Sequence, residues 1–175
     1  MKNVNNIEPL IDMSKIVKKY YIGQPNELEI LHGIDLKVYP GEFVAIVGES
    51  GSGKSTLMNI IGALDKATEG EYFLEGVDLK KCPDEEMSKI RNEKIGFVFQ
   101  NFNLIGRTSA IKNVELPMLY AGMPPKKRTE RAGKLLDMVG MKERGNHQPN
   151  ELSGGEQQRV SLARAIVNNP SVLIA

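Results

Sequence analysis

The sequence has few of the features that mark a protein exported from the cytosol. It contains a single cysteine, Cys82, which excludes an internal disulfide bond and suits a reducing cytosol. Residues 1–12 lack the order of charged and then apolar residues of a secretion signal, so we expect none. No apolar run approaches the roughly 18 residues that a membrane-spanning helix needs. We therefore expect that any function at a membrane is exercised from its cytoplasmic face, through a membrane-spanning partner.

Neither sign of charge is in excess. Lys and Arg number 23 and Asp and Glu number 22, which gives a net charge of +1. A basic excess would favour nucleic acid as a partner and an acidic excess would favour a solvated tail, so we expect neither. The length of 175 residues suits one domain, which can bury roughly 70% of its unfolded surface.

A glycine-rich segment is the most informative feature that is present. Its residues are Gly48, Glu49, Ser50, Gly51, Ser52, Gly53, Lys54, Ser55 and Thr56. The apolar run 43–47 before it predicts a β-strand, and the apolar residues from Leu57 to Leu64 recur at helical spacing after it. A strand, a glycine-rich turn and an amphipathic helix are the context in which G-x-x-x-x-G-K-[ST] indicates a phosphate-binding loop.

The chemistry of phosphate binding explains these residue types. Glycines allow a close approach of the backbone that a Cβ atom would block. The free N–H groups and the dipole of a helix N-terminus both favour an anion. Lys54 can reach the β- and γ-phosphates, and the Ser55 hydroxyl can bind Mg²⁺. The alternative, a flexible surface loop, does not account for the flanking pattern, so we expect the chain to bind a nucleoside triphosphate.

The rest of the N-terminal part of the sequence reads mainly as strands. The predicted strands are 10–20, 29–39, a hairpin of 70–74 with 77–79, and 95–99, the last with Gln100 at its C-terminal end. A short helix is predicted at 83–92, with proline and acidic residues at its start.

Between residues 101 and 150 strand signals give way to helical patterns. These are interrupted at Pro117, Pro124, Gly140 and Gly145, and one helix is predicted from about Lys126. We interpret this part as a helical subdomain inserted into a β-rich nucleotide-binding core. Residues 172–175 then predict a final apolar strand.

A second anion-binding segment is predicted at 152–159, which opens a helix. Ser153 and Glu156 have the spacing of a capping box, so a well-capped helix is one sufficient interpretation. That interpretation leaves Gly154 and Gly155 unexplained, because glycine in a helix costs roughly 1 kcal/mol relative to alanine. Two bare N–H groups and a hydroxyl at a helix N-terminus are suited to bind an anion.

Residues 48–56 and 152–159 together resemble the nucleotide-binding subunit of ABC transporters. Further similar segments are 41–43, 64–65, 96–100 and 113–117. They are most similar to the branch with the macrolide exporters, the lipoprotein-releasing transporters and the cell-division ATPase.

The resemblance implies an α/β fold, a P-loop NTPase core with an antiparallel β subdomain and an inserted α-helical signature subdomain. Residues 1–175 would then be one nucleotide-binding domain. Its implied parts are the core with the β subdomain at 1–100, the helical subdomain at 101–158, and the return to the core at 159–175.

The resemblance also implies roles for single residues. Tyr20, with Tyr21 as its rival, would stack on adenine. Lys54 and Ser55 would contact phosphate and Mg²⁺, and Gln100 would link Mg²⁺ and the attacking water to the transport partner. Lys54 and Gln100 are thus the implied catalytic residues. Ser153, Gly154 and Gly155 would contact the γ-phosphate of ATP held by the opposite subunit of a head-to-tail homodimer.

The sequence departs from the family pattern in two places. The strand at 172–175 resembles the one that leads into an Asp-Glu pair, but no such pair follows, nor does a later histidine. We therefore expect a C-terminally truncated chain that binds ATP and hydrolyses it poorly or not at all by itself. Gly106, Arg107 and Thr108 stand where this branch usually has Pro and Leu, and Lys112 where it has Glu.

Three functions are compatible with both anion motifs. The first is the ATPase subunit of a membrane exporter, partnered by a membrane-spanning permease. The second is a regulatory ABC ATPase that transmits ATP-driven movement to an extracytoplasmic enzyme without transport. The third, a DNA-repair or chromosome ATPase, is disfavoured by the neutral charge and by the absence of sustained heptads between the motifs.

Overall fold

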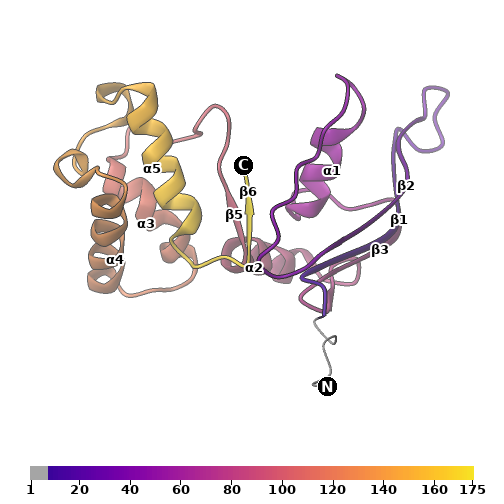
Figure 1. Cartoon of the computed structure of the whole chain (residues 1–175), viewed down its shortest axis with the longest axis horizontal. Coiled ribbons are helices and arrows are strands. Elements are labelled where there is room, and N and C mark those ends of the chain that lie inside the picture. The colour runs from indigo at the N-terminus through magenta and orange to yellow at the C-terminus, as the bar shows by residue number, and fades with distance from the viewer. Residues whose placement is uncertain (1–7) are drawn as a thin grey trace, which may run out of the picture. The chain divides into compact units, whose positions relative to one another are not determined.

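The computed structural model describes residues 8–175, which form two compact units, one ending at Met87 and the other beginning at Ser88 (Figure 1). The first unit contains β1 (Ile11–Tyr20), β2 (Leu28–Val38), α1 (Lys54–Ile61), β3 (Glu69–Leu74) and β4 (Val77–Asp78). Helix α2 (Asp84–Lys94) runs across the boundary. The predicted strands at 10–20 and 29–39, the hairpin and the helix at 83–92 are therefore confirmed.

The first unit is built on an antiparallel sheet with the strand order β2-β1-β3-β4. In the register of this sheet Ile11 lies opposite Val38 on one side and Leu74 on the other. A bulge interrupts the pairing of β1 and β3 beside Gly70, which has φ 92°. A Cβ atom at Gly70 would lie 2.6 Å from the Ser14 carbonyl oxygen, so only glycine fits this bulge.

Apolar side chains from the sheet and from α1 form the core of this unit. Met13, Ile16 and Ile60 are buried to 1% exposure or less. The Tyr72 hydroxyl donates a hydrogen bond of 2.7 Å to the Ile61 carbonyl, which ties β3 to the last turn of α1. Burial raises the pKa of Tyr72, so this phenol stays protonated and remains a donor.

The strand predicted at 43–47 is not formed. This segment pairs with no other strand among residues 8–175, and Phe43 and Val47 are 97% and 86% exposed. An apolar, β-branched sequence favours extended backbone, but a strand also needs a partner to complete its hydrogen-bond ladder. Helix α1 is also shorter than the apolar spacing predicted, because it ends at Ile61 and leaves Leu64 outside.

The second unit contains three main helices, α3 (Ala110–Tyr120), α4 (Pro125–Met138) and α5 (Gly154–Ile166). Two short 3₁₀ turns, η1 (Lys142–Arg144) and η2 (Pro149–Glu151), connect α4 to α5. The predicted final strand is confirmed as β6 (Val172–Ile174), which pairs in parallel with β5 (Ile95–Phe97). The limits proposed for the three parts, 1–100, 101–158 and 159–175, stay predictions.

From the sequence we expected Pro117 to interrupt a helix, but it does not. It lies inside α3, which continues to Tyr120. Proline leaves the carbonyl four residues earlier without its partner, at a cost of about 3 kcal/mol. The fully buried Val114 and Met118 pack in a shared core with α4 and α5, and this burial offsets the cost.

Candidate nucleotide-binding site

The loop before α1 has a backbone that only glycine can adopt at two positions. Gly51 and Gly53 have φ 81° and 87°, in the left-handed region. A Cβ atom at Gly53 would lie 2.9 Å from Leu31 Cδ2 and 3.2 Å from the Ile30 carbonyl oxygen. Gly53 therefore allows the loop to pass close to β2 and turn directly into α1, which begins at Lys54.

The Lys54 side chain turns back over the loop that precedes it. Its ammonium group donates hydrogen bonds to the carbonyls of Gly48, at 2.9 Å, and Glu49, and it lies 3.4 Å from Ser52 Oγ. The loop is closed further by the bond from Ser52 N–H to the Glu49 carbonyl, at 3.3 Å. A positive charge is thereby placed over the curled backbone, beside the N-terminus of α1.

The first turn of α1 has no anionic group of its own. The first hydrogen bond of the helix runs from Leu57 N–H to the Gly53 carbonyl, and no side chain caps the helix or contributes an acid to its first turn. Within the described chain the N–H groups of residues 54–56 therefore have no acceptor. Helix α2, in contrast, carries Asp84, Glu85 and Glu86 in its first turn. The N-terminus of α1 thus fits an anion supplied from outside, such as phosphate.

The remaining residues of the segment lie at the tip of the loop and in the first turn of α1. Glu49 and Ser50 are exposed at the tip, Ser55 is exposed in the first turn of α1, and Thr56 is half-buried. The exposed Ser55 hydroxyl is free to bind a hard cation that accompanies a phosphate. The structure thus brings all the residues predicted from 48 to 56 into one continuous site.

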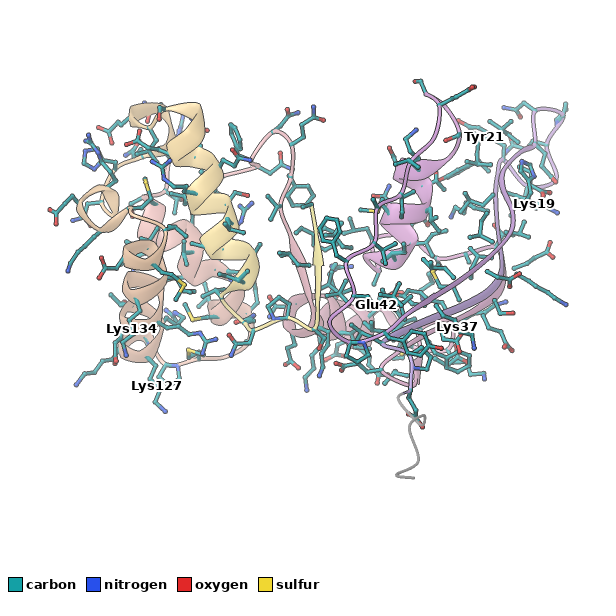
Figure 2. All side chains as sticks on the ribbon, in the orientation of Figure 1. Lys19, Tyr21, Lys37, Glu42, Lys127 and Lys134 are labelled. Atoms are coloured by element: carbon teal, nitrogen blue, oxygen red, sulfur yellow. The ribbon has the colours of Figure 1, made fainter. Side chains whose placement is uncertain are left out.

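The two candidate adenine-stacking tyrosines differ in their surroundings. Tyr20 is half-buried; its hydroxyl donates to Asp65 Oδ2 at 3.3 Å, and the Lys18 ammonium lies 5.0 Å from its ring centroid. Burial alone would raise the pKa of Asp65, but the hydrogen bond from Lys18 and the other donors outweigh burial and lower that pKa. Tyr21 is 57% exposed and has φ 56° (Figure 2).

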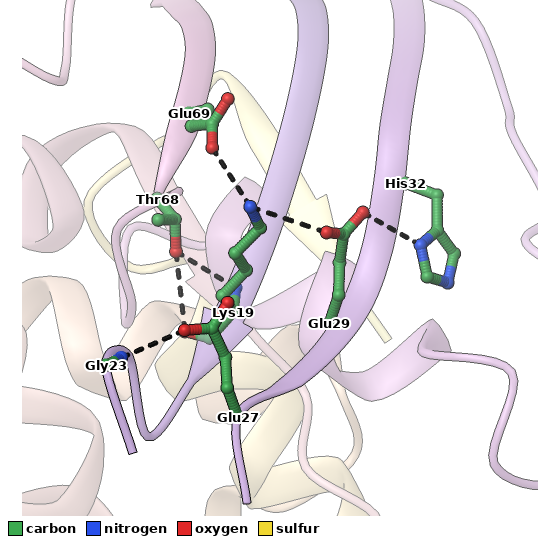
Figure 3. A network of polar contacts seen from close by, with 7 residues as sticks. All are labelled: Lys19, Gly23, Glu27, Glu29, His32, Thr68 and Glu69. Atoms are coloured by element: carbon green, nitrogen blue, oxygen red, sulfur yellow. Dashed lines mark hydrogen bonds and ion pairs between the residues drawn. The ribbon is translucent and has the colours of Figure 1, made fainter. Parts of the chain in front are cut away.

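A network of ion pairs surrounds the end of β1 that carries these tyrosines (Figure 3). The Lys19 ammonium lies 3.3 Å from Glu69 on β3 and 3.5 Å from Glu29 on β2. Glu29 also contacts His32 at 2.9 Å. Hydrogen bonding to Glu69, with the charges of Glu69 and Glu29, raises the pKa of Lys19. The network joins three strand ends and fixes the position of the β1 terminus.

Gln100 lies in an exposed turn that follows β5, in the second unit. The turn is closed by the bond from Phe102 N–H to the Phe99 carbonyl, at 3.0 Å. The next part of the turn is held by a residue that we did not predict, because Arg164 on α5 binds the carbonyls of Phe102 and Asn103. No local sequence pattern indicates this contact, because Arg164 lies 61 positions from Asn103 and 62 positions from Phe102.

The predicted capping box at the start of α5 is confirmed. Ser153 is the N-cap; its hydroxyl accepts from Glu156 N–H at 3.4 Å, and Glu156 accepts from Ser153 N–H at 2.8 Å. The Ser153 hydroxyl also donates to Glu156 Oε2 at 2.8 Å, and the hydrogen bonds that Ser153 N–H and this hydroxyl donate to the carboxylate lower the pKa of Glu156. Gly154 and Gly155 follow, both exposed, so the first turn of α5 presents bare backbone to solvent. Unlike α1, this helix has a side-chain cap and the carboxylate of Glu156 in its first turn, and the capping box alone explains the helix start.

The predicted site residues fall into two groups. Tyr20 and residues 48–56 belong to the first unit, whereas Gln100 and residues 153–155 belong to the second. Among residues 8–175 no three His, Cys, Asp or Glu side chains form a group that could hold a metal ion. Within the same range, no helix combines the length and the apolar character required to cross a bilayer.

Comparisons with known proteins agree with this geometry. Residues 31–175 match the family model of the ABC transporter. The uncharacterized ABC transporter ATP-binding protein YknY of Bacillus subtilis is 52% identical over 95% of this chain and 72% of its own. The macrolide export ATP-binding/permease protein MacB of Azoarcus is also 52% identical over 95% of this chain, which spans only 25% of MacB.

Solved structures extend the likeness to the fold. A dimeric structure of a post-hydrolysis state of the ATP-binding cassette MJ0796, bound to ADP and Pi, matches with a TM-score of 0.84 at 45% identity. The match covers 94% of this chain and 72% of that one. The fold is therefore the α/β fold of the P-loop NTPases, with its antiparallel sheet. The chain belongs to the ABC transporter family and carries the ATP-binding domain of that family.

Proposed function

We propose that this domain binds MgATP through residues 48–56 and that, in the complete protein, ATP hydrolysis drives a membrane export complex. One observation carries the proposal most directly. The N-terminus of α1 has three N–H groups without an acceptor in the described chain and no acid in its first turn, and the Lys54 ammonium lies over the same loop. Such a site gains binding energy only from an external anion with several oxygens.

The other site residues have proposed roles around the triphosphate. Ser55 and Gln100 are proposed to hold Mg²⁺, an ion that offsets charge on the phosphate oxygens during phosphoryl transfer. Lys54 stabilises the same oxygens, and Gln100 orients the attacking water. Tyr20 is proposed to stack on adenine, with Tyr21 as the alternative. These residues position the reactants and stabilise charge, and none of them forms a covalent bond with the substrate.

Ser153, Gly154 and Gly155 are proposed to bind the γ-phosphate of ATP held by a second copy of the domain. The exposed backbone of Gly154 and Gly155 beside the Ser153 hydroxyl supports this role, and MJ0796 is described as a dimeric cassette bound to ADP and Pi. In a head-to-tail homodimer each ATP would lie between the loop of one copy and the α5 N-terminus of the other.

The transport function is inferred from relatives. MacB is named for macrolide export and PvdT of Pseudomonas fluorescens, 49% identical, for pyoverdine export, and both names include a permease. We propose that this domain likewise works at the cytoplasmic face of the membrane, attached to a permease. Gly106, Arg107, Thr108 and Lys112 differ from the usual branch pattern and are candidates for setting which permease it binds.

The alternative is a regulator on the same fold, which passes ATP-driven movement to an extracytoplasmic enzyme. The two proposals differ in the partner rather than in the ATP site. The neighbouring reading frame distinguishes them: a permease with a large extracytoplasmic domain favours export, and a division protein favours the regulator.

Calorimetric titration with MgATP tests the nucleotide site. Lys54→Ala removes a charge-assisted contact to phosphate and should weaken binding by roughly 2 kcal/mol, or about thirtyfold. Lys66→Ala is the matched control, because Lys66 is a lysine of the same unit that binds Asp84 at 3.0 Å and the Cys82 carbonyl instead. Equal affinities of the parent and Lys54→Ala would refute the assignment of the phosphate loop.

A further inference from the structure

Arg164 makes an unusual contact for a residue near the C-terminal end of a helix. Its guanidinium group reaches from α5 to the turn that follows β5, where Nη1 donates to the Asn103 carbonyl at 2.6 Å and Nη2 to the Phe102 carbonyl at 2.7 Å. Two parallel donors on two consecutive carbonyls fix both the position and the orientation of that backbone.

The turn needs such support because its backbone is strained. Phe102 and Asn103 both have φ values in the left-handed region, 58° and 48°. For Phe102 such a conformation costs about 1–3 kcal/mol and persists only where the surroundings hold it, whereas asparagine adopts it more readily. Gln100 lies two residues before Phe102, inside the same turn, so whatever holds Phe102 also limits where Gln100 can be.

The same turn approaches the other end of α5. A Cβ atom built at Gly154, the first residue of the helix, would lie 4.0 Å from the tip of the Phe102 ring. The turn therefore contacts α5 at Arg164 and lies beside the helix start that carries Ser153 and Gly155. Because an α-helix is stiff over 13 residues, the two contacts place the turn and the helix N-terminus in one rigid arrangement.

We propose that Arg164 is a positioning residue that locks the turn bearing Gln100 to α5, so that Gln100 and residues 153–155 move as one body. A change at Gln100 when MgATP binds to one copy is then carried directly to the segment that faces the ATP of the other copy. The inference rests on the proposed role of Gln100 at Mg²⁺, and it adds Arg164 as the residue that holds the Gln100 turn in place.

A purely structural arginine is the competing explanation, and the chain offers a matched control for it. Arg131 on α4 also donates to a backbone carbonyl, from Nε to Val167 at 2.6 Å, but it lies outside the Gln100 turn. Arg131→Met removes one arginine–carbonyl hydrogen bond from the second unit, whereas Arg164→Met removes two. Arg164→Lys keeps the charge and loses the second parallel donor, and it serves if the methionine variant folds poorly.

The first measurement is hydrogen exchange of the backbone amides in the intact protein, without nucleotide. Arg164→Met should speed exchange of residues 99–103 about tenfold and leave the amides of α4 unchanged, since only the turn loses its anchor. Arg131→Met should leave residues 99–103 unchanged. Unaltered exchange of 99–103 in both Arg164 variants, or equal acceleration in Arg131→Met, would overturn the proposal.

The second measurement is the Mg²⁺ dependence of ATP hydrolysis in the complete protein, with Gln100→Ala as the reference. Arg164→Met should raise the Mg²⁺ concentration for half-maximal rate about fivefold, because it acts on Mg²⁺ through the position of Gln100. In a protein that already carries Gln100→Ala, Arg164→Met should therefore cause no further change. No change with Gln100→Ala itself would refute the role of Gln100. A change with Gln100→Ala but none with Arg164→Met would refute the role of Arg164 alone.

Discussion

Glu115 is a buried carboxylate that the ATP site does not use. Its side chain is only 5% exposed, and it accepts hydrogen bonds from Lys112 Nζ at 2.8 Å and from Thr129 Oγ1 at 2.7 Å. Burial alone would raise the pKa of Glu115, but these two donors, with the charges of Lys112 and Arg128, outweigh burial and lower it below 4.5. Glu115 thereby joins α3 to α4 as a carboxylate.

We expect Glu115→Gln to lower the free energy of unfolding by about 2 kcal/mol at pH 7, because hydrogen bonds to a buried charge are lost. A lowered folded pKa stabilises the protein above the unfolded value of 4.5, and this stabilisation disappears as the pH falls through the folded pKa. The difference between the two proteins should therefore shrink below pH 4.5. Urea unfolding at several pH values measures it.

Glu130→Gln is the matched control for that experiment. Glu130 pairs with Lys134 at 2.7 Å on the exposed face of α4, where solvent screens the pair. Its replacement should leave the unfolding midpoint within experimental error. Equal effects of the two substitutions, or a Glu115 effect that persists unchanged at pH 4, would contradict the buried-charge explanation.

Tyr20 permits a separation of stacking from hydrogen bonding. Tyr20→Ala should weaken ATP binding by roughly 1–3 kcal/mol, as loss of an aromatic partner of a base does. Tyr20→Phe keeps the ring and removes only the bond to Asp65, so its affinity should stay near that of the parent. A fluorescent ATP analogue gives the affinities. Loss of affinity in Tyr21→Ala but not in Tyr20→Ala would assign the role to Tyr21.

The sequence predicts well those local geometries whose residues are neighbours along the chain. Residues 48–56 and the capping box of Ser153 and Glu156 carry their geometry in local spacing, and the structure has both local geometries. Arg164 could not be predicted in the same way, because nothing local distinguishes an arginine that will bind carbonyls far away in the sequence. Asn113, fully buried and bonded to Ile105 N–H and to the Thr108 carbonyl, was missed for the same reason.

At the scale of elements, a helix or strand was predicted correctly from the sequence when the segment that it pairs with lies nearby in the sequence. The hairpin of β3 and β4 and the alternating strand β1 followed from pattern and turn residues. The segment 43–47 has an equally apolar pattern, yet it forms no ladder, because pairing is a property of two segments rather than one. Pro117 shows the converse, a local breaker overridden by the burial of its helix neighbours.

The bulge between β1 and β3 provides a prediction at this scale. Gly70→Ala should destabilise the protein by more than about 3 kcal/mol, because a Cβ atom at φ 92° would overlap the Ser14 carbonyl as well as strain the backbone. Gly122→Ala is the control: its φ of 72° is also left-handed, but no atom lies within 4 Å of the added Cβ. The control should cost only about 1 kcal/mol. Urea unfolding followed by far-ultraviolet circular dichroism measures the free energy of unfolding of both variants. Similar losses of stability in the two would exclude the overlap as the cause.

At the scale of the whole molecule, the sites in the two units have different proposed partners. Residues 48–56 need only ATP, whereas residues 153–155 need ATP that a second copy holds. The two functions should therefore separate in mutants. Binding of ATP by one copy should not depend on the α5 N-terminus, whereas closure of two copies should depend on it strongly.

Ser153→Arg and Gly155→Asp test this separation in the intact protein. Arginine places a bulky cation where a hydroxyl must approach phosphate, and aspartate adds repulsion against the γ-phosphate. Each should spare ATP affinity within about threefold and reduce ATP-dependent dimerisation and hydrolysis on the order of a hundredfold, because the closed site does not assemble.

ATP affinity by calorimetry, dimerisation by analytical ultracentrifugation and hydrolysis by phosphate release are measured on one preparation. Met138→Arg, an exposed change on α4 outside residues 152–159, controls for added charge. Dimerisation and hydrolysis at the parent level would show that residues 152–159 are only a well-capped helix. Loss of ATP affinity in both variants would show that residues 153–155 take part in ATP binding by a single copy, against the proposed separation.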